Sequence, residues 1–350
     1  MQLTFGSVCS GIGAPEVAWQ PLGWRCAFVS EIDPFPRAVL THRLGAGTGN
    51  GPEMFGDFTQ IGADDAEPID LLVGGTPCQS FSVAGKRLGL DDPRGNPAIE
   101  YLALARRLRP KWLVWENVPG VLSSNGGRDF GAFLWIMGKC GYGFAYRVLD
   151  AQYFGVPQRR RRVFVVGYLG DWRRAAAVLF EPESMRGDCP PRRETGQAPA
   201  AGIAARAGNG SRSVNGNGNL IAAFGGNNTR GPIDVATARN AHGGPHGRLD
   251  FESETFVVYR TSPTLRAMRP AIRRLTPLEA ERLQGFPDDW TLISYRGKPA
   301  ADGPRYKGTG NSMAVPVMRW IGERIDAAEA AFSCESANGR WRRSVMQKTA

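Results

Sequence analysis

The 350-residue sequence has few of the residues from which metal sites and hydrolytic triads are built. It contains three histidines, two of them in a Gly-rich stretch, so neither a histidine-based metal site nor a Ser-His-Asp hydrolase is expected. Its six cysteines include no CxxC pair, which argues against zinc ribbons and a disulfide framework. No apolar run approaches the roughly 20 residues of a membrane span. The N-terminus lacks the charged start and long apolar core of a signal peptide. We therefore expect a cytoplasmic protein without a membrane partner.

Positive charge is present in excess. Lys and Arg number 43 against 33 Asp and Glu, which gives a formal net charge of +10. Apolar residues make up 42% and charged residues 22%, as in an ordinary globular protein. The length suffices for one large domain or two moderate ones. The charge favours a polyanionic partner but says nothing about the fold.

Short apolar runs alternate with helical spacing over the first 170 residues. This pattern predicts a parallel sheet with helices on both faces, in which ligands bind at the carboxyl ends of the strands. Residues 99–108 have helical spacing, and Pro110 ends this helix. Strands are expected at 3–9, 26–30, 70–73, 112–115 and 163–166.

The composition changes after this region. Residues 201–250 contain 11 Gly and seven Asn with little periodicity, which predicts loops or local disorder. They could form a flexible linker or adaptable loops that close on a partner, and the composition alone favours the linker. A helix is expected to begin at Pro277, capped by Thr276 with Glu279 in its first turn. A last helix is expected at 315–331, followed by a frayed basic tail.

A paired-glycine turn follows the first expected strand. Gly11 and Gly13 allow a tight turn and a close approach of backbone N–H groups to a ligand. Glu31 comes 18 residues later, where an acid can accept hydrogen bonds from ribose hydroxyls. The alternative is a structural turn followed by a solvated acid. Because Glu16 stands where a dinucleotide motif has its third glycine, S-adenosylmethionine fits better than a dinucleotide.

Cys78 follows another expected strand, in the loop Gly-Gly-Thr-Pro-Cys. A thiol at a strand end can act as a nucleophile if nearby N–H groups or cations lower its pKa. Arg160 and Arg162 can supply that positive charge. The usual alternative is an inert buried cysteine. It fits Cys26 and Cys140 better than Cys78, whose neighbours are polar.

Glu116 follows a further expected strand, and a basic run occupies 159–162. An acid beside Cys78 could bind and protonate a ring nitrogen, although it could also be a helix-cap neighbour. Alternate residues of an extended segment face the same side, so Arg160 and Arg162 can both point inward to a phosphate or a base carbonyl. The alternative for such a run is a solvated face.

Taken together, these blocks resemble the C5-cytosine DNA methyltransferase family. The resemblance covers nearly the whole chain except about 173–272, and the blocks occur in the family's order. The combination of Pro-Cys-Gln, Glu-Asn-Val and Gln-Arg-x-Arg is highly specific. The blocks are Ser10-Gly11-Ile12-Gly13, the Glu31 strand end, Gly56-Asp57-Phe58-Thr59, GGTPCQSFSVAGKR, Glu116-Asn117-Val118, GVPQRRRR, RRLTPLEAERLQGFPDDW and GTGNSMAVPV.

The resemblance implies a mechanism. Cys78 would attack C6 of a flipped-out cytosine, and Glu116 would hold and protonate N3. Arg162 would steady the base carbonyl, with Arg160 beside the thiol. The methyl group would pass from S-adenosylmethionine to C5, after which the loss of the C5 proton and of Cys78 would release the product. Residues 80–94 resemble the mobile loop that closes behind the flipped base.

The resemblance also implies a domain plan: an α/β, doubly wound, Rossmann-like methyltransferase domain with a smaller, loop-rich target-recognition domain. The first part of the catalytic domain would span 1–172, the target-recognition region 173–272, the returning part 273–332 and a basic tail 333–350. One departure is Cys9, which stands where the family usually has a Phe stacked on adenine. Positions that match cofactor contacts are Ser10, Gly11, Gly13, Glu31, Asp57, Phe58, Pro77, Asn311 and Ser312.

The expected partner is double-stranded DNA, with the protein acting as a monomer and without a metal. A paired restriction endonuclease is a partner that the family allows, and the recognition sequence is not readable from the chain. Two other functions stay open, a tRNA cytosine-5 methyltransferase of the same family and a DNA-binding protein without activity. A thiol-dependent redox enzyme is disfavoured because no second cysteine lies near Cys78 in the sequence.

Overall fold

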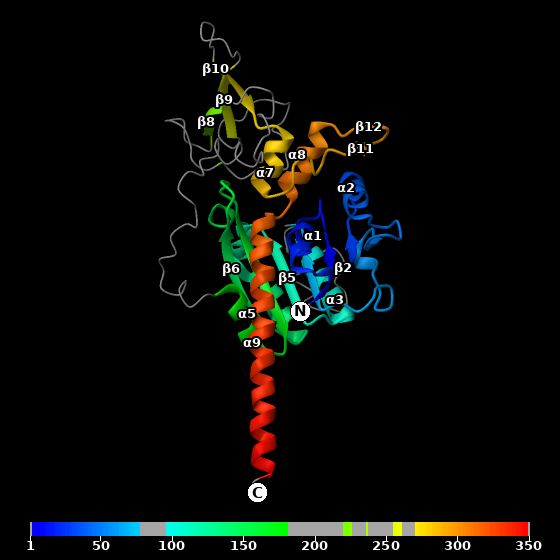
Figure 1. Cartoon of the computed structure of the whole chain (residues 1–350), viewed down its shortest axis with the longest axis vertical. Helices are drawn as coiled ribbons and strands as arrows, with labels where there is room; N and C mark the ends of the chain where they lie inside the picture. The colour runs from blue at the N-terminus through cyan, green and yellow to red at the C-terminus, as the bar shows by residue number, and fades with distance from the viewer. Residues whose placement is uncertain are drawn as a thin grey trace.

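The core of the molecule is a seven-stranded sheet in the order β3-β2-β1-β4-β5-β7-β6 (Figure 1). The computed structural model describes residues 2–77, 96–180, 220–225, 236, 255–260 and 270–348. The strands of this sheet are β1 (Thr4–Val8), β2 (Arg25–Ser30), β3 (Glu53–Phe55), β4 (Leu71–Gly74), β5 (Trp112–Asn117), β6 (Tyr142–Asp150) and β7 (Arg161–Leu169).

Strand direction differs from the sequence prediction at one edge of the sheet. Strands β1 to β5 are parallel, as expected, whereas β7 pairs antiparallel with both β5 and β6. The expectation of a parallel strand at 163–166 is therefore wrong. Residues 151–160 join β6 to β7 directly, and a connection without a crossover helix favours antiparallel pairing. As a result, the start of β7 lies at the same edge as the carboxyl ends of β4 and β5.

Helices cover both faces of the sheet. Alternate strand residues supply the two apolar layers, so that Leu71 and Val73 pack on one side and Leu72 on the other. Helices α1, α2, α5 and α9 contribute to the first layer, and α3 and α4 to the second. This confirms the predicted doubly wound α/β architecture. The helices are α1 (Ala14–Trp19), α2 (Pro34–Leu44), α3 (Pro97–Leu108), α4 (Arg128–Lys139), α5 (Trp172–Leu179), α7 (Pro277–Gln284), α8 (Asp302–Asn311) and α9 (Val315–Lys348).

Helix α9 brings the end of the chain back onto its beginning (Figure 1). The indole N–H of Trp19 donates to the Met318 carbonyl at 2.7 Å, and that of Trp112 donates to Glu329 Oε1 at 2.9 Å. The helix continues to Lys348, so the end expected at residue 331 is wrong, whereas the fraying of the basic tail stays a prediction. Residues 333–348 contain no proline and one glycine, and nothing in that stretch forces a helix to end.

A smaller antiparallel sheet in the order β10-β9-β8 belongs to the second half of the chain. It lies at the end of the molecule opposite the C-terminal end of α9 (Figure 1). Its β8 falls within 201–250, so the expectation of loops there is wrong for residues 220–225. The strands of this half are β8 (Leu220–Gly225), β9 (Thr255–Arg260) and β10 (Pro270–Arg274), with a short hairpin of β11 (Ser294–Tyr295) and β12 (Lys298–Pro299).

The helix expected at Pro277 is confirmed. The Thr276 hydroxyl accepts from the backbone N–H of Glu279 at 3.3 Å, and Glu279 Oε2 accepts from the Thr276 N–H at 2.7 Å. This reciprocal capping box fixes the start of α7. Arg273 forms an ion pair with the same carboxylate at 2.7 Å, which ties the end of β10 to α7.

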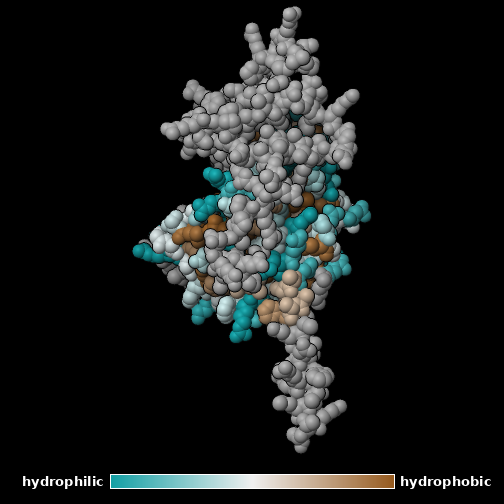
Figure 2. Space-filling view, turned by 60° about the vertical axis from the view of Figure 1, so that its left-hand side comes forward, coloured by the Kyte–Doolittle hydropathy of each residue, from teal (hydrophilic) through white to brown (hydrophobic). Residues whose placement is uncertain are grey.

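The visible surface of the described residues is largely hydrophilic, with separate apolar patches (Figure 2). The exposed large side chains are spread over the fold, with Trp135 on α4, Trp172 on α5 and Ile32 in the loop between β2 and α2. Scattered apolar residues are ordinary on a folded protein. Within the described ranges, no helix combines the length and the hydropathy that a membrane span requires.

Candidate active site

The glycine turn after β1 has the conformation that its sequence predicts. Gly11 and Gly13 have φ angles of 56° and 89°, in the left-handed region that favours glycine. A Cβ on Gly11 would meet nothing within 4 Å, so the backbone itself faces open space. Cys9 is also left-handed, with φ at 49°. The Ser10 hydroxyl donates to the Ser7 carbonyl at 3.0 Å, which makes it a brace of the turn.

Glu31 links this turn to the end of β2. Its Oε2 accepts the Gly11 N–H at 2.8 Å, and its Oε1 accepts the N–H groups of Ile32 and Asp33, both at 2.9 Å. A carboxylate offers about four lone-pair sites, so these three bonds leave room on Oε2 for one further donor. The carboxylate is thus held in place by the backbone and can still accept one hydroxyl.

A cavity of about 420 Å³ lies beside this carboxylate. Four predicted cofactor residues line it: Glu31, Asp57, Phe58 and Pro77. Ser10, Gly11, Gly13, Asn311 and Ser312 do not belong to its lining, although Gly11 is bonded to Glu31. The other lining residues are Cys9, Ser30, Ile32, Gly56, Thr59, Asn96, Pro97 and Glu100.

Asn96 is a residue of this cavity that sequence reasoning missed. Its Oδ1 caps α3 by accepting the Ala98 N–H at 3.0 Å. Its amide nitrogen Nδ2 is buried and has no hydrogen-bond partner within the described ranges. Buried donors are rarely left without an acceptor. The Asn-Pro pair before a helix was a readable capping signal, but only the fold places it beside Glu31 and Phe58.

Cys9 forms part of the same wall. Burial, with the nearby charges of Glu31 and Asp57, raises the pKa of its thiol to about 12. The group therefore stays protonated and behaves as a small apolar side chain. Cys9 lines the cavity at the position where the resemblance expects a Phe stacked on adenine.

The end of β4 carries the backbone toward Cys78, which lies outside the described residues. Thr76 is anchored by two side chains of β5. The Trp115 indole donates to its hydroxyl at 2.9 Å, and the Asn117 amide donates to its carbonyl at 3.1 Å. Pro77, the next residue, is exposed at this edge. The chain that leads into the predicted nucleophile is thus fixed by the neighbouring strand.

Glu116 and Arg162 meet at the same edge. β5 and β7 are antiparallel, with Glu116 opposite Phe164. The start of β7 therefore lies beside the carboxyl end of β5. Arg162 Nε lies 3.0 Å from Glu116 Oε1. Burial raises the pKa of the Glu116 carboxyl, and the charges of Arg162 and Arg160 oppose that rise without cancelling it.

Gly75 permits this arrangement. A Cβ at residue 75 would lie 2.8 Å from Met313 Cε and 3.0 Å from Glu116 Oε2. A side chain at residue 75 would therefore require Met313 to move and the Glu116 carboxylate to give by a few tenths of an ångström. Sequence analysis assigned no role to Gly75, since its neighbour in space is more than forty residues away.

Among the described residues, Arg160 bonds to backbone carbonyls at the end of α8. Its guanidinium donates to the carbonyls of Gly310 and Ser312 at 3.1 and 2.7 Å. Burial, aided by the like charge of Arg162, lowers its pKa to about 9. The contacts tie the entry to β7 to the end of α8, where Asn311 and Ser312 lie. Its predicted place beside the thiol stays a prediction.

The structure therefore brings most of the predicted residues to one edge of the sheet. Glu116, Arg160 and Arg162 lie together, and the cofactor cavity opens next to Pro77. Within the described residues, no group of three or more His, Cys, Asp or Glu side chains forms a metal site. The arrangement defines an α/β protein with a ligand site at the carboxyl ends of its strands, where the acid at the end of β2 faces a cavity and a charged cluster lies at the end of β5.

Comparison with known proteins gives the family. A model described as C-5 cytosine-specific DNA methylase matches residues 3–197 and 207–327. The chain belongs to the C-5 cytosine-specific DNA methylase family. This confirms the resemblance, the enzyme class and the function class inferred from the sequence.

Curated relatives cover most of the chain. The Type II methyltransferase M.HpaII of Haemophilus parainfluenzae is 31% identical, over 93% of this chain and 89% of its own length. M2.BsuMI of Bacillus subtilis is 28% identical, over 93% of this chain and 76% of its own length. A protein of Escherichia phage P1 named DNA N-6-adenine-methyltransferase is 36% identical over 93% of this chain. The chain spans only 61% of the length of that phage protein.

Solved structures support the fold alone. The S. pombe Dnmt2 methyltransferase superposes with a TM-score of 0.61 at 16% identity, covering 93% of this chain and 99% of that one. A putative DNA modification methyltransferase from an E. coli prophage gives 0.56 at 18% identity, covering 94% and 100%. Both agree with the Rossmann-like methyltransferase fold described above.

Proposed function

We propose that this protein methylates C5 of cytosine in duplex DNA, with Cys78, Glu116 and Arg162 surrounding the flipped base. The observation that carries the proposal is the ion pair of the buried Glu116 with the half-buried Arg162, 3.0 Å apart, at the carboxyl end of the sheet where β4 leads into Pro77. Family membership supplies the reaction class, and this pair supplies the groups that such a reaction requires around a pyrimidine.

The residues around the 420 Å³ cavity fit S-adenosylmethionine. Glu31 retains one acceptor site for a ribose hydroxyl, and the orphaned Asn96 Nδ2 offers a buried donor. Phe58, Cys9 and the prolines give apolar walls for a flat ring. When bound, S-adenosylmethionine supplies the electrophilic methyl group. Asn311 and Ser312 are proposed to contact it from the α8 side, held there by Arg160.

Glu116 is proposed to act on the base. As the Cys78 thiolate forms a bond to C6, the electron pair of the C5–C6 double bond shifts to form a C4–C5 double bond. The electron pair of the C4–N3 double bond moves onto N3, which takes a proton from Glu116. A carboxyl whose pKa is raised by burial is a better proton donor near neutral pH than an exposed one. C5 would then take the methyl group that S-adenosylmethionine supplies, with S-adenosylhomocysteine as the leaving group. Loss of the C5 proton to a base and departure of the Cys78 thiolate from C6 restore the C5–C6 double bond, and N3 returns its proton to the Glu116 carboxylate.

Arg162 is proposed to orient both the acid and the base. Its Nε–H faces Glu116, and one terminal nitrogen donates to the Arg161 carbonyl at 2.8 Å. A guanidinium has five N–H donors, so these contacts leave donors for the exocyclic carbonyl of cytosine. Pulling electron density toward that carbonyl favours attack at C6.

The test uses labelled S-adenosylmethionine and unmethylated genomic DNA, since the target sequence is not specified. We expect nucleoside analysis to show 5-methylcytosine, and Cys78→Ala to remove the label. Cys140→Ala, which changes a buried cysteine of the second apolar layer, is the matched control and should retain activity. Equal labelling by the Cys78 variant would remove Cys78 from the mechanism.

The phage P1 relative raises a second candidate, methylation of adenine N6. Because the chain matches only 61% of that protein, the adenine activity can belong to the unmatched part. The same nucleoside analysis decides the question. A product that is N6-methyladenine, with no 5-methylcytosine, would replace the proposal.

The remaining expectations are proposals of the same kind. Residues 173–272, with the β8–β10 sheet, are proposed to read the target sequence, and 273–332 to complete the catalytic domain. We propose a monomer acting on DNA in the cytoplasm, with a paired endonuclease where one accompanies it. Transfer to tRNA in preference to duplex DNA, or DNA binding without turnover, would support one of the two other functions left open by the sequence.

A further inference from the structure

A second cavity, of about 510 Å³, lies behind α1, away from the cofactor residues. It shares none of its lining with the first cavity. The two lie along the same strand, with Ser30 at the end of β2 in one and Arg25 to Ala27 at its start in the other. The lining residues are Phe5, Glu16, Gln20, Trp24, Arg25, Cys26, Ala27, Leu44, Gly49, Asn50, Gly51, Pro52 and Glu67.

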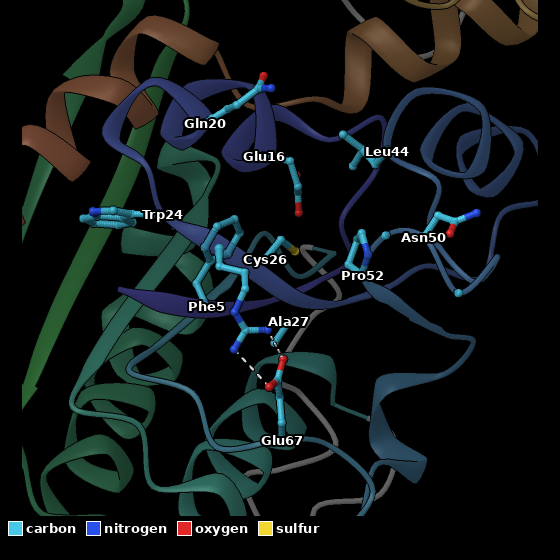
Figure 3. Close-up of a pocket in the computed structure, with 13 residues that line it drawn as sticks. Phe5, Glu16, Gln20, Trp24, Cys26, Ala27, Leu44, Asn50, Pro52 and Glu67 are labelled. Atoms are coloured by element: carbon cyan, nitrogen blue, oxygen red, sulfur yellow. Dashed lines mark hydrogen bonds and ion pairs between the residues drawn. The ribbon is translucent and has the colours of Figure 1, made fainter. Parts of the chain in front are cut away.

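Glu16 is the feature that sets this cavity apart. Figure 3 shows its carboxylate pointing into the space that it lines with Cys26 and Pro52. The residue is 5% exposed. Neither of its carboxylate oxygens has a hydrogen-bond partner among the described residues. A buried carboxylate without a partner is costly, so an acid in this position needs an explanation.

The other charges at the cavity do not neutralise Glu16. Arg25 and Glu67 form two hydrogen bonds with each other at the rim, one of 2.9 Å, so the arginine is already paired (Figure 3). The Cys26 thiol donates to the Phe28 carbonyl at 3.4 Å, and burial raises its pKa well above the ordinary value. Arg25 and Glu67 are therefore a balanced pair, Cys26 is neutral, and the cavity has one acid without a counter-charge.

We infer that this cavity binds a primary alkylammonium group, which pairs with Glu16 while its aliphatic chain lies against the apolar walls. Phe5, Ala27 and Leu44 supply those walls, and Asn50 and Gln20 stand among the polar residues. An ammonium offers three donors to a carboxylate that has none. An aliphatic amine with a pKa of about 10.4 keeps its charge at neutral pH. This inference does not rest on the proposed function.

The groups that titrate around Glu16 give the binding a defined pH dependence. Burial raises the pKa of Glu16 to about 7, and the backbone N–H of Glu16 and the Ser7 hydroxyl, which lie near the carboxylate, oppose that rise without cancelling it. Cys26 on β2 stays protonated, while Arg25 and Glu67 at the rim stay ionised as a pair. α2 contributes only Leu44. The ionised fraction of Glu16 therefore rises about tenfold between pH 6 and pH 8.

The experiment is calorimetric titration of the full chain, without DNA, using n-butylamine as the probe. We expect measurable binding that strengthens about tenfold from pH 6 to pH 8. Glu16→Gln, which keeps the shape and removes the charge, should weaken binding at least tenfold. Glu53→Gln, which changes an exposed acid of β3 outside the cavity, is the matched control and should bind like the unchanged protein.

A second variant guards against misfolding of the first. Asn50→Lys leaves Glu16 in place but brings its own ammonium to the cavity lining, so it should weaken butylamine binding. Three results would overturn the inference: no binding of butylamine at pH 8, equal binding by Glu16→Gln, or equal binding of the neutral analogue n-butanol. Because the readout is binding without DNA, its outcome is independent of any methyl-transfer assay.

Discussion

At the scale of single residues, the site depends on a glycine that touches the predicted acid. A Cβ on Gly75 would come within 3.0 Å of Glu116 Oε2 and 2.8 Å of Met313 Cε. The Met313 side chain can move, but moving the carboxylate takes it out of place. The carboxylate must give by a few tenths of an ångström, less than the 1 Å misplacement that can cost about 100-fold, so we expect Gly75→Ala to lower kcat several-fold.

The measurement is steady-state methyl transfer beside thermal unfolding. Gly120→Ala is the matched control, since a Cβ there would meet nothing within 4 Å. Full activity of Gly75→Ala would show that the carboxylate need not hold its position for the reaction.

Glu16 gives a residue-scale prediction about stability. Its pKa is about 7 in the folded protein against an ordinary 4.5, so the folded state binds the extra proton. Its contribution to stability is largest below pH 4.5 and is lost as the pH rises through 7. Relative to Glu16→Gln, the unchanged protein should lose about 2 to 3 kcal/mol of unfolding free energy between pH 5 and pH 8.

Urea unfolding at the two pH values measures this difference. Parallel pH profiles for the two proteins would mean that Glu16 is solvated or paired in the folded state.

Residues that belong to recognisable motifs could be assigned to a site from the sequence. Residues whose role depends on a contact with a distant part of the chain could not. Glu31, Asp57, Phe58 and Pro77, which the motifs group together, line one cavity, which we propose to be the cofactor site. Asn96 and Gly75 gave no comparable signal, because their roles arise from contacts that only folding creates. Ser10 is the opposite example, a motif residue for which a cofactor contact was predicted. In the structure its hydroxyl stabilises the turn by donating to the Ser7 carbonyl.

At the scale of elements, Arg160 couples β7 to α8. Two hydrogen bonds of its guanidinium reach the carbonyls on either side of Asn311. A lysine can hold a charge there but has no planar fork to bridge both carbonyls. We expect Arg160→Lys to lose about 2 kcal/mol of stability, as for hydrogen bonds from a charged group. We also expect it to raise KM for S-adenosylmethionine more than it lowers kcat.

Kinetics with varied S-adenosylmethionine check this split, and Arg161→Lys, at an exposed neighbouring arginine, is the control. A variant that keeps KM and loses only kcat would instead place Arg160 at the reacting base.

The elements themselves were predictable to different degrees. Apolar runs gave four of the five parallel strands, and the capping box gave the start of α7. The direction of β7 was not readable, because an apolar strand looks the same in either direction until its connection to β6 is known. Strand β8 was not predicted, because its six residues lie in a stretch whose Gly- and Asn-rich composition indicates loops.

At the scale of the whole molecule, the first and last parts of the described chain pack together. Helix α9 packs on α1 and α5, so the first and last parts of the described chain share one apolar layer. The small β8–β10 sheet lies at one end, and the C-terminal half of α9 points away from it (Figure 1). If the end with the small sheet holds DNA, the basic residues near the C-terminus lie outside the interface.

This arrangement predicts how DNA affinity depends on salt. A protein that neutralises about six phosphates loses about 10³-fold in affinity between 50 and 200 mM salt. We expect a loss of that order for this protein, whose net charge is +10. Replacing both Arg342 and Arg343 by Gln should leave the slope of log K against log salt nearly unchanged, because neither would release counterions from the duplex. Fluorescence anisotropy with a labelled duplex measures both slopes. A slope that becomes shallower by about two in the double variant would place the end of α9 on the DNA, and a flat response in the unchanged protein would mean that its charge serves another purpose.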